Sequence, residues 1–515
     1  MAGGPINKEL RKPLLVLTDP TLFGNDVAED EKEDIFYSYV LERRDFEPFF
    51  NVDNQVCISR AYKGEGKSAL LRLVRHKISN SRAEIIDVAK TASEIVPDIT
   101  REDYSLWTKG WKASILSMFA NEIGARIGVA WTDDAMSLVE EAEKSGFRRK
   151  SILFSILDRL KLPSIKFANA ELTVPERKIL GTANPSEAVK RWAKEKVELW
   201  LFVDDVDKNF ENTKLMKMKV ASFFDACREL ANIVPELRIR TAVRPNIWAI
   251  IKPEYESLSH IEQYAHDLRW SEDLIRQLLT KRMIGYLKRT KQWEGYYQNL
   301  EGSKEDRDMA IISLAFVEDM PWGSKGGKRP PYVILNTLSK HRPRWVIELA
   351  KVSAKAAVKR THERITYEDI VGELSAFGNR RIQDTVAEFA SQCPQLDEII
   401  AAFGREREQF TTAELLKIID RKVLTHISPK IVGITGRVNN LNVAHLLYEI
   451  GFFYARRDFS DSSYEHITYA DKPTLLRART AIDEGLSWEI HPVFRQVLEI
   501  RDSSGKVYSP KRRIF

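Results

Sequence analysis

Short apolar runs alternate with longer amphipathic segments through the first half of the chain. Four runs have the length and composition of buried strands, and they lie at 55–59, 84–88, 197–203 and 237–243. Between them, apolar residues recur every three or four positions, which predicts helices at 69–78, 107–127, 149–160 and 215–232. Strands that alternate with helices pair in parallel through right-handed crossovers. The pattern therefore predicts an α/β fold built on a parallel sheet.

Helical periodicity replaces the strand pattern after about residue 266. Ser271 is a predicted N-cap, because two acidic residues follow it and an apolar helical face comes next. Later in the chain, helices at 411–421 and 442–450 precede the strand-like runs 452–456 and 464–469. Helix, helix and hairpin in this order are typical of a winged helix.

Three parts follow from this order of elements. We expect an α/β core over 1–265 that contains a helical insertion at about 91–196. A helical domain is expected over 266–390, and a winged-helix-like domain over 391–515.

The composition fits a soluble protein with an ample core, since 43% of the 515 residues are hydrophobic and 30% are charged. No run of about 18 apolar residues predicts a membrane span, and the first residues lack the apolar region of a signal peptide. The three cysteines, Cys57, Cys227 and Cys393, lie far apart, which argues against disulfides or a zinc site. A cytoplasmic location is the expectation.

The charge is only mildly basic, with 80 basic and 74 acidic residues and a net charge of +6. A dedicated nucleic-acid binder concentrates its excess charge on one face. Here the basic clusters at 281–291, 325–329 and 506–513 are modest. We expect them to be solvated surface, and contact with DNA or RNA stays open as the alternative.

The residues after the first strand match most of a phosphate-binding loop. The usual pattern is G-x-x-x-x-G-K-[ST], and 61–68 read Ala-Tyr-Lys-Gly-Glu-Gly-Lys-Ser. Gly64 and Gly66 let the backbone curl so that its N–H groups point at phosphate oxygens. Lys67 is expected to reach the β- and γ-phosphates of ATP, and Ser68 to offer its hydroxyl to Mg²⁺. An alanine at position 61 costs little where φ is negative.

The same loop supplies the other expected nucleotide contacts. Lys63, Glu65 and Ala69 complete the stretch predicted to bind ATP, next to the positive end of the following helix. The alternative is a chance match in a surface turn. The position between an apolar strand and an amphipathic helix favours the phosphate-binding loop.

Acidic residues end the most apolar strand of the chain. Asp204 is predicted to hold Mg²⁺, and Asp205 to orient or deprotonate the attacking water. For Asp207, a bond to the loop backbone is preferred to a bond to the metal. The alternative is a strand-ending turn with solvated acids.

Two arginines and one aromatic residue are further candidates for the site. Arg244 follows the strand 237–243, where a residue that contacts the γ-phosphate would lie; a surface arginine is the alternative. Arg344 opens a long helix beside Pro343 and is preferred to Arg342 for the same task. Phe23 lies in the turn before the first strand, and the resemblance to P-loop ATPases implies that such a segment lines the adenine; an ordinary helix entry is the alternative.

The C-terminal region combines aromatic and basic residues. Its aromatic residues alternate as sheet-core residues do, so core packing is preferred to base stacking: Phe452, Phe453, Tyr454, Tyr464 and Tyr469. Four arginines could line a groove there: Arg456, Arg457, Arg477 and Arg479.

Together these residues resemble bacterial AAA+/STAND-type P-loop ATPases of a kind often found among phage-defence genes. The resemblance rests on four groups of residues besides the loop at 64–68: Phe23-Gly24 with Ala28, Glu29 and Glu31; 204–207; 342–344; and 490–494. It implies a P-loop NTPase core with a helical lid, and a switch driven by ATP and Mg²⁺. It also implies a homo-oligomer and an effector protein encoded nearby. The insertion at 91–196 is the candidate region for sensing a trigger.

Two other interpretations stay open. The first is a nucleotide-gated DNA-binding protein that grips duplex through its winged helix. The second is a scaffold that binds ATP without turnover, because Asp205 is shorter than the glutamate that many relatives carry there. The sequence contains no nuclease, protease or deaminase constellation, so any such activity would belong to a partner.

Overall fold

The computed structural model describes residues 13–81, 85–127, 198–298, 300–322, 327–460 and 463–508. The chain divides into two compact units. The parallel-sheet unit comprises Arg43–Tyr62 and Lys67–Leu268, and the helix-rich unit comprises Met1–Glu42, Lys63–Gly66 and Arg269–Phe515. The tip of the predicted phosphate-binding loop, Lys63–Gly66, thus makes its contacts with the helix-rich unit.

A five-stranded parallel sheet forms the centre of the parallel-sheet unit, in the order β2-β3-β4-β1-β5. Its strands are β1 (Val56–Arg60), β2 (Ile85–Thr91), β3 (Glu198–Asp204), β4 (Leu237–Val243) and β5 (Ala265–Asp267). Residues 200–203 of β3 are all buried, as expected of a strand covered on both faces. The predicted α/β fold and four of the five strands are confirmed. The fifth, β5, is too short and too exposed to give an apolar run.

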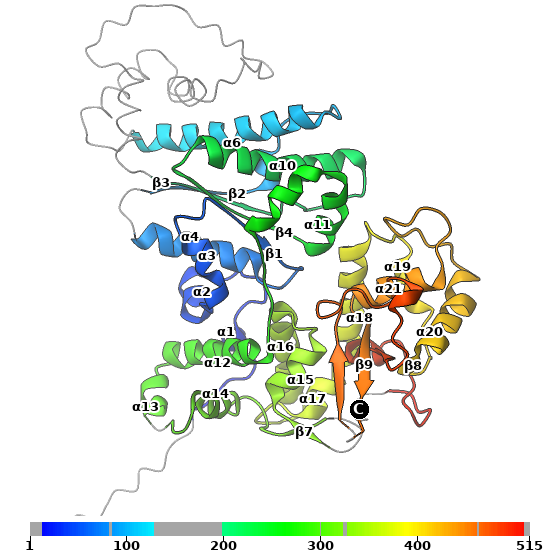
Figure 1. Cartoon of the computed structure of the whole chain (residues 1–515). Helices are drawn as coiled ribbons and strands as arrows, with labels where there is room; N and C mark the ends of the chain where they lie inside the picture. The colour runs from blue at the N-terminus through cyan, green and yellow to red at the C-terminus, as the bar shows by residue number, and fades with distance from the viewer. Residues whose placement is uncertain are drawn as a thin grey trace, which may run out of the picture. The chain divides into compact units, whose positions relative to one another are not determined.

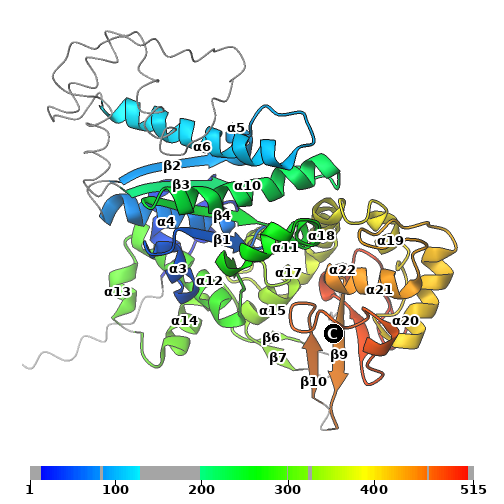
Figure 2. The same cartoon turned by 45° about the horizontal axis from the view of Figure 1, so that its top comes forward.

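Helices cover both faces of this sheet, with α6 and α10 on one side and α4 on the other (Figures 1 and 2). Their bounds are α4 (Lys67–Ser81), α5 (Ala92–Ile95), α6 (Tyr104–Ile127), α10 (Lys214–Ile233) and α11 (Pro245–Ile251). The indole of Trp111 joins α6 to α10, since it packs on Phe223 at 5.1 Å and donates to the Lys219 carbonyl at 3.0 Å. The predicted helix at 149–160 and most of the predicted insertion lie outside the described residues.

The helix-rich unit begins with the N-terminal segment, α1 (Pro20–Phe23) and α2 (Glu33–Tyr39). Further helices follow, among them α12 (Glu272–Arg289), α14 (Lys304–Ile312), α15 (Pro331–Leu338), α16 (Pro343–Lys359), α17 (Tyr367–Gly372) and α18 (Leu374–Phe389). Ser271 caps α12 as predicted, because its hydroxyl accepts the Leu274 N–H at 3.2 Å. Pro343 is the first residue of α16.

Basic residues of α12 hold the N-terminal segment. Lys281 donates to the Val40 carbonyl at 2.6 Å, Arg282 to the Phe23 and Asn25 carbonyls, and Arg289 to the Thr21 carbonyl at 2.8 Å. The cluster at 281–291 was predicted to be solvated surface, and for these residues the prediction is wrong. Carbonyls in loops and in the last turn of a helix have no helical partner and need donors, and long basic side chains provide them.

The C-terminal part of the helix-rich unit contains an antiparallel sheet in the order β10-β9-β11-β8. Its elements are α19 (Leu396–Ala401), β8 (Gln409–Thr411), α20 (Thr412–Ile418), a π-helical turn (Ile419–Leu424), α21 (Asn440–Glu449), β9 (Phe453–Asp458), β10 (Tyr464–Ile467), β11 (Ser487–Ile490) and α22 (Pro492–Arg495). The predicted hairpin corresponds to β9 and β10. Phe452, Phe453 and Tyr454 are core residues as expected, whereas Tyr464 is 44% exposed.

In the described part of the chain, no helix has both the length and the apolar character of a membrane span. All three cysteines are buried free thiols.

Candidate nucleotide site

The predicted phosphate-binding loop lies between β1 and α4. Gly64 and Gly66 have φ values of 85° and 99°, a region that favours glycine. Ala61 has no positive φ, so alanine is accommodated there. The Lys67 ammonium turns back onto the loop and donates to the carbonyls of Ala61 at 2.7 Å and Tyr62 at 3.3 Å.

The two predicted magnesium ligands are hydrogen-bonded to each other. The Asp204 carboxylate, at the end of β3, bonds to the Ser68 hydroxyl and accepts the Asp205 N–H at 2.8 Å. Desolvation raises the pKa of Asp204 above its usual value, and these two bonds oppose the rise. A hydroxyl beside a carboxylate is an oxygen donor pair that suits Mg²⁺.

Asp205 has a strained backbone. Its φ is 56°, which is uncommon for a residue other than glycine. Its carboxylate is half-exposed and lies 3.4 Å from the Lys208 ammonium. Such strain persists only where the surroundings impose it, and it gathers at functional sites. The sequence pattern gave no sign of this strain.

Arg244 and Asp207 form an ion pair that joins the end of β4 to the end of β3. The buried Asp207 carboxylate accepts the Arg244 backbone N–H at 2.6 Å and its Nε at 3.0 Å. Arg244 also donates through Nη2 to the Asp207 carbonyl. Asp207 thus bonds to backbone, as expected. Arg244 was predicted to contact the γ-phosphate, but in this arrangement its guanidinium is directed at Asp207, because a buried carboxylate needs a counter-charge.

Within the helix-rich unit, four hydrogen bonds hold the loop tip Lys63–Gly66. The Lys63 N–H donates to Glu388 Oε1 at 2.8 Å, and the Arg344 N–H donates to the Gly64 carbonyl at 3.2 Å. The Trp270 indole donates to the Glu65 carbonyl at 2.8 Å, and Arg342 Nη1 lies 3.4 Å from the Lys63 carbonyl. Residues from α16, α18 and the start of α12 therefore fix the backbone of this tip.

The two arginines at the start of α16 have different surroundings. Arg342 is buried, pairs with Glu388 at 2.7 Å and stacks on the Trp345 ring at 4.4 Å. The Arg344 side chain is about one-third exposed, and its Nε lies 3.7 Å from Asp26. A Cβ placed on Gly64 would lie 3.0 Å from the Arg344 Cβ. Both arginines thus lie beside the loop, Arg344 through its backbone N–H and Arg342 through its guanidinium.

The sequence did not single out Glu388 or Trp270. Each is one residue without a motif, and Glu388 meets Lys63 across 325 positions of the chain. Only the fold brings them to the loop.

Phe23 was expected to line the adenine, yet its ring lies in the core of the helix-rich unit. The residue is 1% exposed and its ring packs against Phe316 at 5.9 Å. The next residue, Gly24, has a φ of 67°, and a Cβ there would lie 2.7 Å from the Glu31 carboxylate. The Phe23 ring is therefore covered by neighbouring side chains of the same unit, and the turn that carries it is closely packed.

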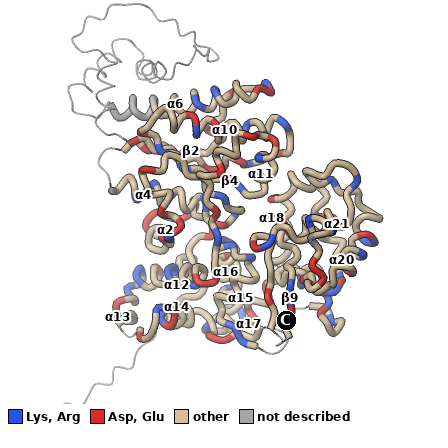
Figure 3. The backbone as a smooth tube through the Cα atoms, viewed as in Figure 1, with Lys and Arg blue, Asp and Glu red and all other residues tan. Residues whose placement is uncertain are grey.

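The C-terminal arginines are partly committed to acidic neighbours. Arg456 pairs with Asp458 at 2.8 Å and stacks on Tyr464 at 4.1 Å, and Arg457 pairs with Asp483 at 2.9 Å. Basic and acidic positions are interspersed along the elements of both units (Figure 3). These ion pairs give no support to a phosphate-binding groove at Arg456 and Arg457.

Comparison with known proteins gives distant similarities. No family model matches the chain. A curated protein of Escherichia coli (strain K12), the putative transposon gamma-delta 80.3 kDa protein, is 22% identical over 466 residues. That match covers 86% of this chain and 62% of the relative, so the chain spans less than two thirds of the relative's length.

Two solved structures are also similar. Cdc6p from Pyrobaculum aerophilum is 11% identical with a TM-score of 0.30, and the match covers 93% of this chain and 98% of that chain. The Drosophila ORC bound to DNA is 11% identical with a TM-score of 0.28, over 91% and 93% of the two chains. Identities of this size do not assign the chain to a family.

Proposed function

We propose that this protein binds ATP with Mg²⁺ at the loop 61–68 and hydrolyses it to ADP and phosphate. The observation that carries the proposal is the hydrogen bond between Ser68 and Asp204. It joins the start of α4 to the end of β3, so the residue types that hold Mg²⁺ in a P-loop NTPase meet beside the loop that would cradle the phosphates.

Each loop residue has a task under this proposal. The backbone N–H groups of 63–69 face phosphate oxygens, with Gly64 and Gly66 providing the turn. Lys67, which now donates to its own loop, turns to the β- and γ-phosphates. Ser68 and Asp204 hold Mg²⁺, whose charge neutralises the phosphate oxygens.

The hydrolysis step depends on Asp205. Its carboxylate orients the attacking water or accepts its proton, and the imposed left-handed backbone fixes its direction. Arg344, whose N–H donates to the Gly64 carbonyl, is the proposed contact to the γ-phosphate. Arg244 supports the site indirectly by holding Asp207 at the end of β3.

The contacts of the loop tip support the proposal that ATP hydrolysis drives a molecular switch. The tip Lys63–Gly66 bonds to α16 and α18, so a change of the loop on binding phosphate alters contacts of those helices. From the resemblance alone, we place this switch in bacterial anti-phage defence, in a homo-oligomer that acts with a separate effector protein. Co-purification with proteins encoded beside it, with and without ATP, tests that placement.

Phosphate release and ATP binding test the activity itself. Wild type should release phosphate, Lys67→Ala should lose ATP binding, and Asp205→Asn should bind ATP but lose turnover. Exposed residues provide matched controls, Lys355→Ala and Asp98→Asn, which should behave as wild type. If wild type binds ATP but is as slow as Asp205→Asn in every oligomeric state, the protein is a non-hydrolysing scaffold.

A further inference from the structure

A cavity of about 430 Å³ lies within the helix-rich unit. Its walls come from the C-terminal sheet, α15, the start of α12 and α22, and the neighbourhood of the β6–β7 ribbon (Met320–Pro321 and Lys328–Arg329). It shares no lining residue with the phosphate-binding loop. Small-molecule sites usually enclose about 300–1,000 Å³, so this space suits a small ligand.

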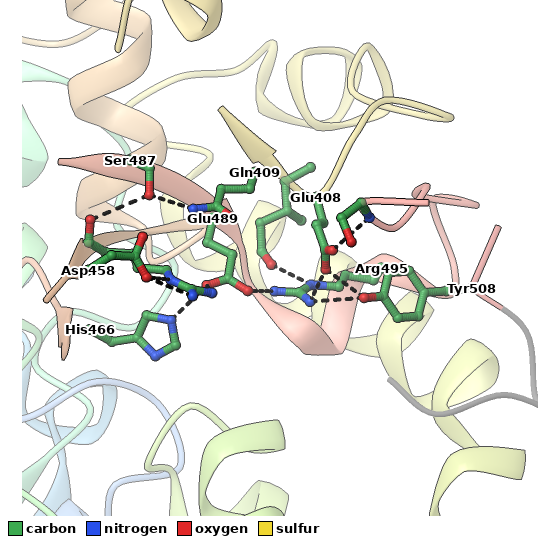
Figure 4. Close-up of polar contacts among 11 residues, drawn as sticks. Glu408, Gln409, Asp458, His466, Ser487, Glu489, Arg495 and Tyr508 are labelled. Carbon is green, nitrogen blue, oxygen red and sulfur yellow. Dashed lines mark hydrogen bonds and ion pairs between the residues drawn. The ribbon is translucent and has the colours of Figure 1, made fainter. Parts of the chain in front are cut away.

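Buried charges stabilise the side of the cavity formed by β11 and α22 (Figure 4). Arg495 is 1% exposed and donates to Glu489, to Glu408 at 2.6 Å and to the Ile490 carbonyl at 2.8 Å. Burial alone would raise the pKa of Glu489, but Arg495 and His466 hold it below its usual range. The Glu489 carboxylate is therefore ionised and fixed in place.

This carboxylate orients the imidazole of His466. His466 Nε2 lies 2.7 Å from Glu489 Oε2, and an ionised carboxylate can only accept, so Nε2 carries a proton. The second ring nitrogen points away from Glu489 (Figure 4). On this residue, which lines the cavity, Nδ1 accepts a hydrogen bond when the imidazole is neutral and donates one when it is protonated.

A second lining histidine, His491, carries a hydrogen-bond donor. His491 is 1% exposed, and its Nδ1 accepts the Val493 N–H at 3.2 Å. Burial lowers the pKa of His491 well below its usual value, so the ring is neutral and Nε2 carries the proton. That Nε2 has no hydrogen-bond partner in the described part of the chain. A buried polar group without a partner costs free energy, and a ligand that enters far enough to accept from it would recover that cost.

We propose that this cavity binds a small, neutral, planar heteroaromatic ligand of the nucleobase class. The edge of such a ring carries both donors and acceptors, so it can bond to His466 Nδ1 in either protonation state and accept from the His491 N–H. Tyr454 and Tyr464 also line the cavity, and aromatic side chains pack well against a planar ring.

Other ligand classes fit the lining less well. A polyanion would need several cations, but Arg495 is committed to Glu489 and Glu408. The lining also includes one acidic and one basic exposed residue, Glu272 and Arg329, which balance each other. A purely aliphatic ligand would leave His466 and His491 unsatisfied.

Calorimetric titration with adenosine, guanosine, cytidine and uridine tests the proposal. Titrations are run on Lys67→Ala as well as wild type, so that binding at the cavity is separated from the phosphate-binding loop. We expect at least one nucleoside to bind both proteins with a submillimolar Kd. His466→Ala should weaken binding about tenfold, as expected for the loss of one hydrogen bond. Val333→Trp, which fills the cavity from α15, should abolish it.

Two matched controls should keep the wild-type Kd. Val358→Trp makes the same substitution on an exposed face of α16, and His426→Ala removes an exposed imidazole elsewhere. Circular dichroism confirms the folding of each variant, and the partly exposed His466 provides the test if Val333→Trp does not fold. The proposal is overturned if no nucleoside binds at millimolar concentration, if only phosphate or an oligonucleotide binds, or if His466→Ala leaves the Kd unchanged.

Discussion

The Glu388 carboxylate accepts the backbone N–H of Lys63 at 2.8 Å, and its other oxygen pairs with Arg342 at 2.7 Å. One buried side chain thus connects the tip of the phosphate-binding loop to the start of α16. Because both partners are buried, the carboxylate has to be replaced together with the arginine to avoid an isolated charge.

Glu388→Ala should therefore lower the free energy of unfolding by about 3–5 kcal/mol, since it leaves the Arg342 guanidinium buried without this partner. Urea unfolding measures the change, and the exposed Glu363→Ala is the control. The pair of substitutions Arg342→Met and Glu388→Leu should recover much of the loss. A Glu388→Ala protein as stable as the control would show that Glu388 does not hold the loop.

Substitutions at Asp205 separate backbone strain from chemistry. Asp205→Gly and Asp205→Ala both remove the carboxylate, so both should lose phosphate release. They should differ in stability, because a left-handed backbone costs an L-residue about 1–2 kcal/mol relative to glycine. Thermal unfolding should thus rank Asp205→Gly above Asp205→Ala. Equal stability would mean that residue 205 relaxes its φ of 56° in solution.

The sequence predicts most of the architecture of the nucleotide site because its signals are local. Continuous apolar runs identified β3 and β4, and Ser271 gave a local cap signal. The strands β5, β8 and β11 have only three or four residues. β11 also contains the buried, charged Glu489, so its composition does not resemble a strand that packs in a core.

Long-range partners could not be predicted in the same way. Arg282 binds the Phe23 carbonyl across 259 positions, and Phe23 is buried as a result of contacts that the sequence does not encode locally. Arg244 was correctly placed at the end of β4, but its partner Asp207 depends on how the ends of β3 and β4 meet. Local pattern therefore predicts a loop and acidic residues as candidates, whereas the partners of each arginine depend on tertiary contacts.

Removal of the Arg244 side chain should lower the free energy of unfolding. Arg244→Ala leaves the Asp207 carboxylate buried without its counter-charge, which should cost about 3 kcal/mol in the free energy of unfolding. The double variant Arg244→Ala with Asp207→Asn should be more stable than Arg244→Ala alone. Urea unfolding measures both, with Arg101→Ala as an exposed control. If Arg244→Ala lowers phosphate release but leaves stability unchanged, Arg244 contacts the nucleotide instead.

Acid unfolding should reveal the ionised Glu489 at the cavity. Its pKa is lowered in the folded state by Arg495 and His466, so the unfolded chain binds the proton more readily. The stabilisation is then fully present above the usual glutamate pKa of about 4.3 and is lost as pH falls further toward the lowered folded value. Glu489→Gln removes this contribution, so its stability at neutral pH should be lower and its acid dependence flatter than in wild type.

Glu465→Gln is the matched control for that experiment, because it makes the same change on an exposed position of β10. It should retain the wild-type slope of stability against pH below about 4.3, the usual glutamate pKa. The two substituted positions differ in one respect: of these two glutamates, Glu489 lies against the Arg495 guanidinium and Glu465 is exposed. Parallel acid curves for wild type and Glu489→Gln would show that the folded and unfolded chains bind this proton equally, and would remove the electrostatic basis for orienting His466.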